Sequence, residues 1–208
     1  MISNKLLFIP LVFFALSAGL GVLMRYGQVY GLVFPGFQNL LQAHSHVTFL
    51  GWGFLSVLLL IHTYFEIPLD KKYKWLWGIL VLSVMGLLIL FPIYGYTLIP
   101  ISFLVIFLLA SYLYLGRLLK GMKVTEGFEY SLLRYGIYYY FISSLAVWFV
   151  PVALLKFGKS ILYYDLVYFY LHFLYNGFFV FVLFSLYFFS VQQDQSVFEY
   201  PGFDVIDV

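Results

Sequence analysis

Cysteine is absent from the 208-residue sequence, and charged residues make up only 10% of it. Without cysteine there are no disulfides and no thiolate ligands, so a metal site would have to use imidazole, carboxylate or carbonyl groups. Soluble proteins carry about 25% charged residues, so the low charge excludes an ordinary water-soluble domain. The formal net charge of +2 gives no indication of a nucleic-acid partner.

Sequence motifs of soluble catalysis are also missing. The chain has no glycine-rich phosphate-binding loop, no nucleophile elbow and no helical His-Glu-x-x-His zinc motif. These absences favour a chain that is not an enzyme by itself.

Apolar residues dominate the sequence: 64% of it is hydrophobic, and it contains 25 Phe, 20 Tyr and 4 Trp. Runs of 18 or more apolar residues indicate membrane-spanning helices, and aromatic residues pack between helices and settle at membrane interfaces. The apolar run after Lys5 is long enough for an uncleaved first span. The sequence therefore predicts an all-α, multi-pass integral membrane protein, which we expect in a bacterial inner (plasma) membrane.

Six spans are predicted, in one transmembrane domain covering residues 1–191. Their approximate ranges are 6–23, 37–65, 75–94, 98–119, 131–157 and 161–191. Residues 192–208 are expected to form an acidic cytoplasmic tail of coil or strand. Pro151 is expected to kink or end the fifth span.

Lysine and arginine in the short loops set the orientation of such a bundle, because cytoplasmic loops are richer in them. One side collects eight of these residues and the other side collects three. The eight are Lys5, Lys71, Lys72, Lys74, Arg117, Lys120, Lys123 and Arg134, and the three are Arg25, Lys156 and Lys159. Both termini are therefore predicted to be cytoplasmic.

Two histidines, His44 and His46, fall inside the second span, where an ionisable residue indicates function by default. His44 is about 10 Å into the span, and on a regular helix the two side chains point about 200° apart. They should therefore face different neighbours instead of clamping one ion. His62 follows His44 by 18 residues, or five full turns, so the two should share a face. His62 lies at the far end, and we expect it to be structural.

The sixth span carries a polar stripe. Asp165, His172 and Asn176 are spaced seven and four residues apart, which places them on one helical face. Tyr168 and Tyr175 flank His172. His172 is about 16 Å into its span, so we expect it at a depth similar to that of His44. The stripe could orient a metal ligand or carry protons.

Two segments resemble the catalytic subunits of the haem-copper oxidase superfamily. In the second span, Ala43-His44 is followed by Val47-Thr-Phe-Leu-Gly-Trp-Gly53, and the family has an axial haem histidine in such a setting. The spacing of His44, His46 and Gly51 is also similar to the NnrS family of haem- and copper-containing membrane proteins. In the sixth span, Tyr170-Leu-His172-Phe-Leu-Tyr-Asn-Gly177 is similar to the oxidase segment whose histidine binds copper.

The resemblance implies a haem b or copper site and an oxidoreductase-related role in electron transfer or the handling of O2 or NO. It implies His44 and His172 as cofactor ligands, His46 as a further metal ligand, and Gly51 and Trp52 as cofactor contacts. Only the N-terminal half of an oxidase subunit is matched, and the family takes its remaining ligands from later spans. A second copy, a partner membrane chain or the rest of a longer protein would have to complete such a centre.

Two functions of other classes stay open at this point. A transporter or proton channel would use the stripe of Asp165, His172 and Asn176 as its polar path. A structural or assembly subunit would use its histidines only for helix packing, and Gly51 and Trp52 would then serve close helix contact and interface anchoring.

Overall fold

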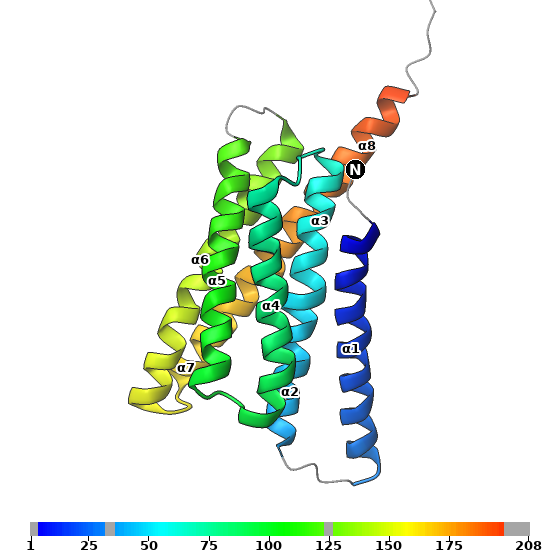
Figure 1. Cartoon of the computed structure of the whole chain (residues 1–208). Helices are drawn as coiled ribbons and strands as arrows, with labels where there is room; N and C mark the ends of the chain where they lie inside the picture. Colours follow the sequence, from blue (N-terminus) through cyan, green and yellow to red (C-terminus); the bar gives the residue numbers. More distant parts are fainter. Residues whose placement is uncertain (1–3, 32–35, 123–126, 198–208) are drawn as a thin grey trace, which may run out of the picture. The chain divides into compact units, whose positions relative to one another are not determined.

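The computed structural model describes residues 4–31, 36–122 and 127–197, and within them all regular structure is helical (Figure 1). The elements are α1 Asn4–Val29, α2 Phe37–His46, η1 Val47–Phe54, α3 Leu55–Tyr64, α4 Lys71–Tyr94, α5 Leu98–Gly121, α6 Phe128–Phe157, α7 Ile161–His172, η2 Phe173–Phe179 and α8 Val180–Val197. The elements η1 and η2 are π-helices, each continuous with the α-helices on either side. The described residues therefore contain six helices long and apolar enough to cross a membrane.

The predicted all-α architecture with six spans is confirmed, and most span boundaries agree within a few residues. The sixth helix differs at its end, because α8 continues to Val197. Residues 192–197 are thus helical and not the coil or strand predicted for the tail, and the rest of that tail lies outside the described residues. Pro151 does not end a helix, since α6 runs through it to Phe157.

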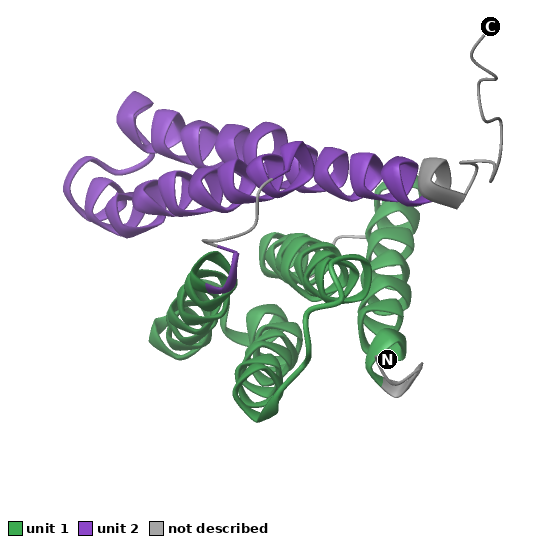
Figure 2. Ribbon diagram, turned by 90° about the horizontal axis from the view of Figure 1, so that it is seen from above, with its two compact units in different colours: residues 1–120 green, residues 121–208 purple. Residues whose placement is uncertain are grey.

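The helices group into two compact units, residues 1–120 and residues 121–208, coloured green and purple in Figure 2. Unit 1 contains α1 to α5, and unit 2 contains α6, α7, η2 and α8. The grouping of all six spans in one domain, 1–191, stays a prediction.

In unit 1, the continuous helix α2–η1–α3 packs against α1 and against α4. Gly51 in η1 shows how close these helices come. A Cβ at Gly51 would lie 2.8 Å from Val84 Cγ1 in α4 and 2.9 Å from Phe13 Cγ in α1. Only a residue without a side chain fits between the two helices, and the buried apolar core of unit 1 is built around this approach.

The turn between α4 and α5 needs glycine for two reasons. Gly95 has a φ of 60°, and a Cβ there would collide with the side-chain amide of Asn39 in α2. The two helices are therefore joined by a tight turn that lies against the start of the second span.

In unit 2, α6 packs along α7, η2 and α8, to which it is connected through the turn at Gly158. Two glycines mark the closest approaches. A Cβ at Gly136 in α6 would lie 2.9 Å from Val182 Cγ2, and one at Gly177 in η2 would lie 2.5 Å from Tyr139 Cβ. Since Tyr139 Cβ is fixed to its backbone, the second contact leaves no room for adjustment.

Gly177→Ala is therefore expected to destabilise the protein by about 1–3 kcal/mol, the usual cost of overpacking a tight contact. The measurement is the midpoint of thermal unfolding in detergent. Gly78→Ala is the matched control, because that glycine is also helical but nothing lies within 4 Å of an added Cβ. A Gly177→Ala protein as stable as the control would contradict the packing described for η2.

Candidate functional site

The first ten residues of the second span, helix α2, are far more polar than the rest. They include Gln38, Asn39, Gln42 and both histidines His44 and His46. The whole span has 28 residues, more than the ~20 that a bilayer requires. The apolar part, η1 and α3, begins at Val47. The two histidines thus stand where the polar part of the span meets its apolar part.

His44 is held by α1. Its Nδ1 lies 2.8 Å from the carbonyl oxygen of Ser17, and Ser17 is buried. Because a carbonyl only accepts, Nδ1 carries the hydrogen, and Nε2 keeps its lone pair. Nε2 has no hydrogen-bond partner among the described residues. Gly21 makes room for the ring, since a Cβ there would lie 3.1 Å from His44 Cε1.

His46 is turned toward α4 instead. Its Nδ1 donates to the carbonyl oxygen of Gln42 at 2.8 Å, and Tyr96 Oη lies 3.4 Å from its Nε2. The ring also packs on Phe91, with centroids 4.8 Å apart. His44 and His46 therefore contact different helices, as their spacing predicts. Both nitrogens of His46 are engaged, so its lone pair is less available than that of His44.

Both histidine-bearing spans change to π-helical geometry directly after a histidine. η1 begins after His46, and η2 begins after His172. Segments of π-helix are rare and occur often at functional sites. The sequence did not predict these π-helices, and only the glycines Gly51 and Gly177 within them could have indicated an unusual helix geometry.

The residues suggested as cofactor contacts in η1 have packing roles. The space in front of Gly51 is filled by Phe13 and Val84. Trp52 is 39% exposed, and its ring lies 4.8 Å from that of Phe14. Neither residue contacts His44 by any interaction described, so a cofactor role for them stays a prediction without geometric support.

The polar stripe of the sixth span lies on one exposed face of unit 2. Asp165, Tyr168 and His172 line a hollow of about 240 Å³ together with two phenylalanines, Phe169 and Phe173. The rings of Tyr168 and His172 stack with centroids 6.0 Å apart. The predicted grouping of Asp165, Tyr168 and His172 is thus present within one helix face.

Asn176 sits at the end of this stripe, one turn after His172. Its Nδ2 lies 3.4 Å from His172 Nδ1. The amide's oxygen and nitrogen are interchangeable in position, so the side chain can accept from Nδ1–H and leave Nε2 of His172 with its lone pair. Tyr175 is half-buried and does not line the hollow.

The structure thus brings the predicted residues together as two groups, one in each unit. His44 and His46 belong to unit 1, whereas Asp165, Tyr168, His172 and Asn176 belong to unit 2. In the parts of the chain that the structure describes, no group of three or more His, Cys, Asp or Glu side chains could hold a metal ion. A pairing of His44 with His172 stays a prediction.

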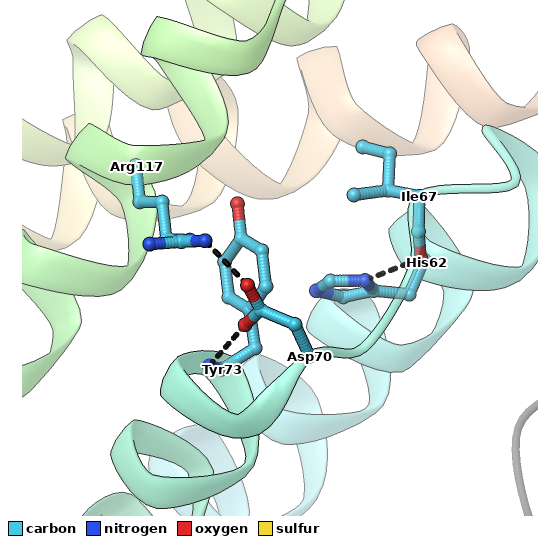
Figure 3. A network of polar contacts seen from close by, with 5 residues as sticks. All are labelled: His62, Ile67, Asp70, Tyr73 and Arg117. Carbon is cyan, nitrogen blue, oxygen red and sulfur yellow. Dashed lines mark hydrogen bonds and ion pairs between the residues drawn. The ribbon is translucent and has the colours of Figure 1, made fainter.

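A third polar group surrounds His62, at the far end of α3 (Figure 3). His62 is buried, its Nδ1 donates to the carbonyl oxygen of Ile67 at 2.9 Å, and Tyr114 Oη donates to its Nε2 at 2.7 Å. The ring of Tyr73 packs edge-on against the imidazole at 4.7 Å. Both nitrogens are satisfied, which agrees with the structural role expected for this histidine.

Asp70 closes this network at the start of α4. Its Oδ1 accepts from the backbone N–H of Tyr73 at 3.0 Å, and its Oδ2 pairs with Arg117, whose guanidinium also lies over the Tyr73 ring (Figure 3). The Tyr73 N–H and the Arg117 charge lower the pKa of the Asp70 carboxyl below its ordinary value. Asp70 before Lys71 is a typical helix-capping position, and this signal in the sequence could have located the network.

The prediction that His44 and His62 share a face is wrong. His44 contacts α1, whereas His62 contacts α4 and α5 through Tyr73 and Tyr114. The five-turn count assumed a regular α-helix, but the π-helix η1 lies between the two residues.

No protein-family model, curated protein or solved structure matches this chain. The resemblance to the haem-copper oxidases therefore rests on the two segments around His44 and His172 alone.

Proposed function

We propose that this six-span membrane protein binds a b-type haem or a copper ion, with His44 as the principal ligand and His172 as the second. The observation that carries the proposal is the state of His44. Its Nδ1–H is fixed by the Ser17 carbonyl, and its Nε2 has no hydrogen-bond partner among the described residues. Histidines that bind metals are usually held in this way, with the second ring nitrogen donating to a carbonyl or carboxylate.

The chain's own residues would orient the imidazole. The Ser17 carbonyl fixes the tautomer with Nε2 unprotonated, which is the form that binds iron or copper. Gly21 leaves space beside the ring, where a Cβ would lie 3.1 Å from His44 Cε1. When bound, the haem or copper would supply one-electron chemistry or a binding position for a small ligand such as O2 or NO.

His172 supports the proposal from unit 2. It is exposed on a membrane-spanning helix, although an imidazole there is costly unless it finds a partner. A bond from its Nε2 to a cofactor would remove that cost, and the side chain of Asn176 would hold Nδ1. We propose His172 of the same chain as the second ligand. His172 of a second copy, or a histidine of a partner membrane chain, is the alternative source.

The absorption spectrum and metal content of the full-length protein test this proposal, with the protein purified from cells supplied with haem and copper. We expect either the bands of haem ligated by imidazole or copper at a fixed ratio to protein. A protein that is colourless and free of both, even after incubation with haem and with copper, would overturn the proposal.

The hollow on unit 2 favours a second candidate, a proton-conducting channel or transporter. Its lining brings a carboxylate, a phenol and an imidazole, from Asp165, Tyr168 and His172, onto one face of a span. Such groups form proton relays in membrane proteins. If cofactor-free protein in liposomes conducts protons and His172→Ala does not, this function stands in place of the first.

A further inference from the structure

We propose that one end of unit 1, formed by the start of α4 and the end of α5, binds the headgroups of anionic phospholipids. The site consists of Lys71, Lys72, Lys74 and Lys120, here named the lysine cluster. The first three begin α4, and Lys120 lies in the last turn of α5. The pairing of Asp70 with Arg117 brings the two helix ends together. The proposal is independent of any cofactor at His44.

The lysine cluster has one close carboxylate neighbour, Asp70, which interacts with the charge and the backbone N–H of Lys72. All four side chains are exposed, and none forms an ion pair in the described part of the chain. Asp70, the nearest acid in sequence, is occupied by the Tyr73 N–H and by Arg117. Glu66 is the other acid at this end, and it forms no ion pair with a lysine that the structure describes.

The position of three lysines in the first turn of α4 is electrostatically unfavourable. The N-terminus of a helix carries a partial positive charge, so cations there destabilise it. This first turn contains no acidic residue, and Asp70 is the only carboxylate directly before it. An external anion would relieve the repulsion. Loop lysines that served only to orient the protein would not need to lie inside the helix.

An aromatic residue places the lysine cluster at headgroup level. Trp75 lies one turn after Lys71 on the same side of α4, and it is 68% exposed. Indole rings settle at the boundary between headgroups and hydrocarbon. Lys71 and Lys72, which lie four and three residues closer to the start of α4, would then reach the phosphates of the same leaflet.

The remainder of this face is apolar along the length of α4. Lys71, Trp75, Leu82, Ile89 and Ile93 follow one another at spacings of four, seven, seven and four residues, which return to one side of a helix. The four apolar residues are 58% to 68% exposed. A cationic end followed by a ring and a continuous apolar stripe matches a phospholipid, with its anionic headgroup and acyl chains. A soluble anion would not need the stripe.

The test measures lipid-dependent stability of the full-length protein in detergent. Phosphatidylglycerol, phosphatidylcholine with the same acyl chains, and inorganic phosphate are each titrated while the midpoint of thermal unfolding is recorded. We expect a larger rise with phosphatidylglycerol than with phosphatidylcholine, and none with inorganic phosphate. A lysine near an anionic membrane surface strengthens binding about fivefold. The combined change Lys71→Gln, Lys72→Gln, Lys74→Gln and Lys120→Gln should therefore weaken the phosphatidylglycerol effect at least about tenfold.

Two further variants test whether the effect comes from the positive charge of these four lysines or from substituting surface lysines in general. Replacing the same four lysines with arginine keeps the charge and should keep the preference. Changing Lys156→Gln and Lys159→Gln, two exposed lysines around the α6–α7 turn, should leave it intact. Equal shifts with the two lipids, an unchanged preference in the four-glutamine variant, or an equal response to inorganic phosphate would each overturn the proposal.

Discussion

A protein carrying His44→Ala is expected to lose the haem or copper signal of the wild type, whereas His46→Ala is expected to keep most of it. The difference follows from the lone pairs. His44 Nε2 has no partner among the described residues, while His46 uses one nitrogen for the Gln42 carbonyl and the other for Tyr96. The readouts are the absorption spectrum and the ratio of cofactor to protein after purification.

Two controls separate loss of a ligand from loss of the fold. The unfolding midpoint of His44→Ala should stay close to that of the wild type, and added imidazole should restore part of the spectrum by occupying the vacated space. Gly21→Ala should shift the spectrum without abolishing it, because the new methyl group would press on the His44 ring from 3.1 Å. A His44→Ala protein with the wild-type spectrum and stoichiometry would exclude His44 as the ligand.

His62→Leu is expected to produce a large loss of stability without affecting the cofactor. The change leaves the hydroxyl of Tyr114 buried without its acceptor, and Tyr114 is fully buried. An unsatisfied buried polar group costs about 1–3 kcal/mol. Tyr114→Phe should cost a similar amount, because it leaves Nε2 of His62 without a donor. The free energy of unfolding in detergent measures both effects.

The two changes combined should cost much less than the sum of their separate effects. Removing both partners of a buried hydrogen bond leaves nothing unsatisfied between them and can be nearly neutral. The double-mutant cycle of His62→Leu and Tyr114→Phe is thus expected to show a coupling of about 1 kcal/mol or more. Additive effects would mean that the hydrogen bond between the two side chains does not contribute to stability.

The sequence predicts the spans well because apolar runs and charged turns are strong local signals. The turns at residues 95–97 and 158–160 were therefore located correctly, and the charged turn after residue 65 was found, although α4 begins at Lys71, four residues before the predicted start of the third span. Which side of each span is buried could not be predicted in the same way, because a membrane helix is apolar all round and has no amphipathic face to read. The grouping of the helices into two units could likewise not be predicted from the sequence.

The candidate site was predicted as residue types but not as contacts. His44 and His172 were identified from their position in apolar runs. The acceptor for His44 lies 27 residues away in α1, and it is a backbone carbonyl that any residue at position 17 would provide. The donor for His62, Tyr114, lies 52 residues away and is one of 20 tyrosines. Such pairings depend on helix packing, which the sequence pattern does not encode locally.

The π-helix η1 determines how the two halves of the second span, α2 and α3, are rotated relative to each other about the helix axis. Its wider turns change the angular phase between α2 and α3. The His44 side chain of α2 contacts α1, whereas the His62 side chain of α3 contacts Tyr73 of α4 and Tyr114 of α5. Deleting a single residue within Val47–Phe54 would rotate one half against the other. Either the His44–Ser17 contact or the His62–Tyr114 contact would then be lost, although every residue that forms them would still be present.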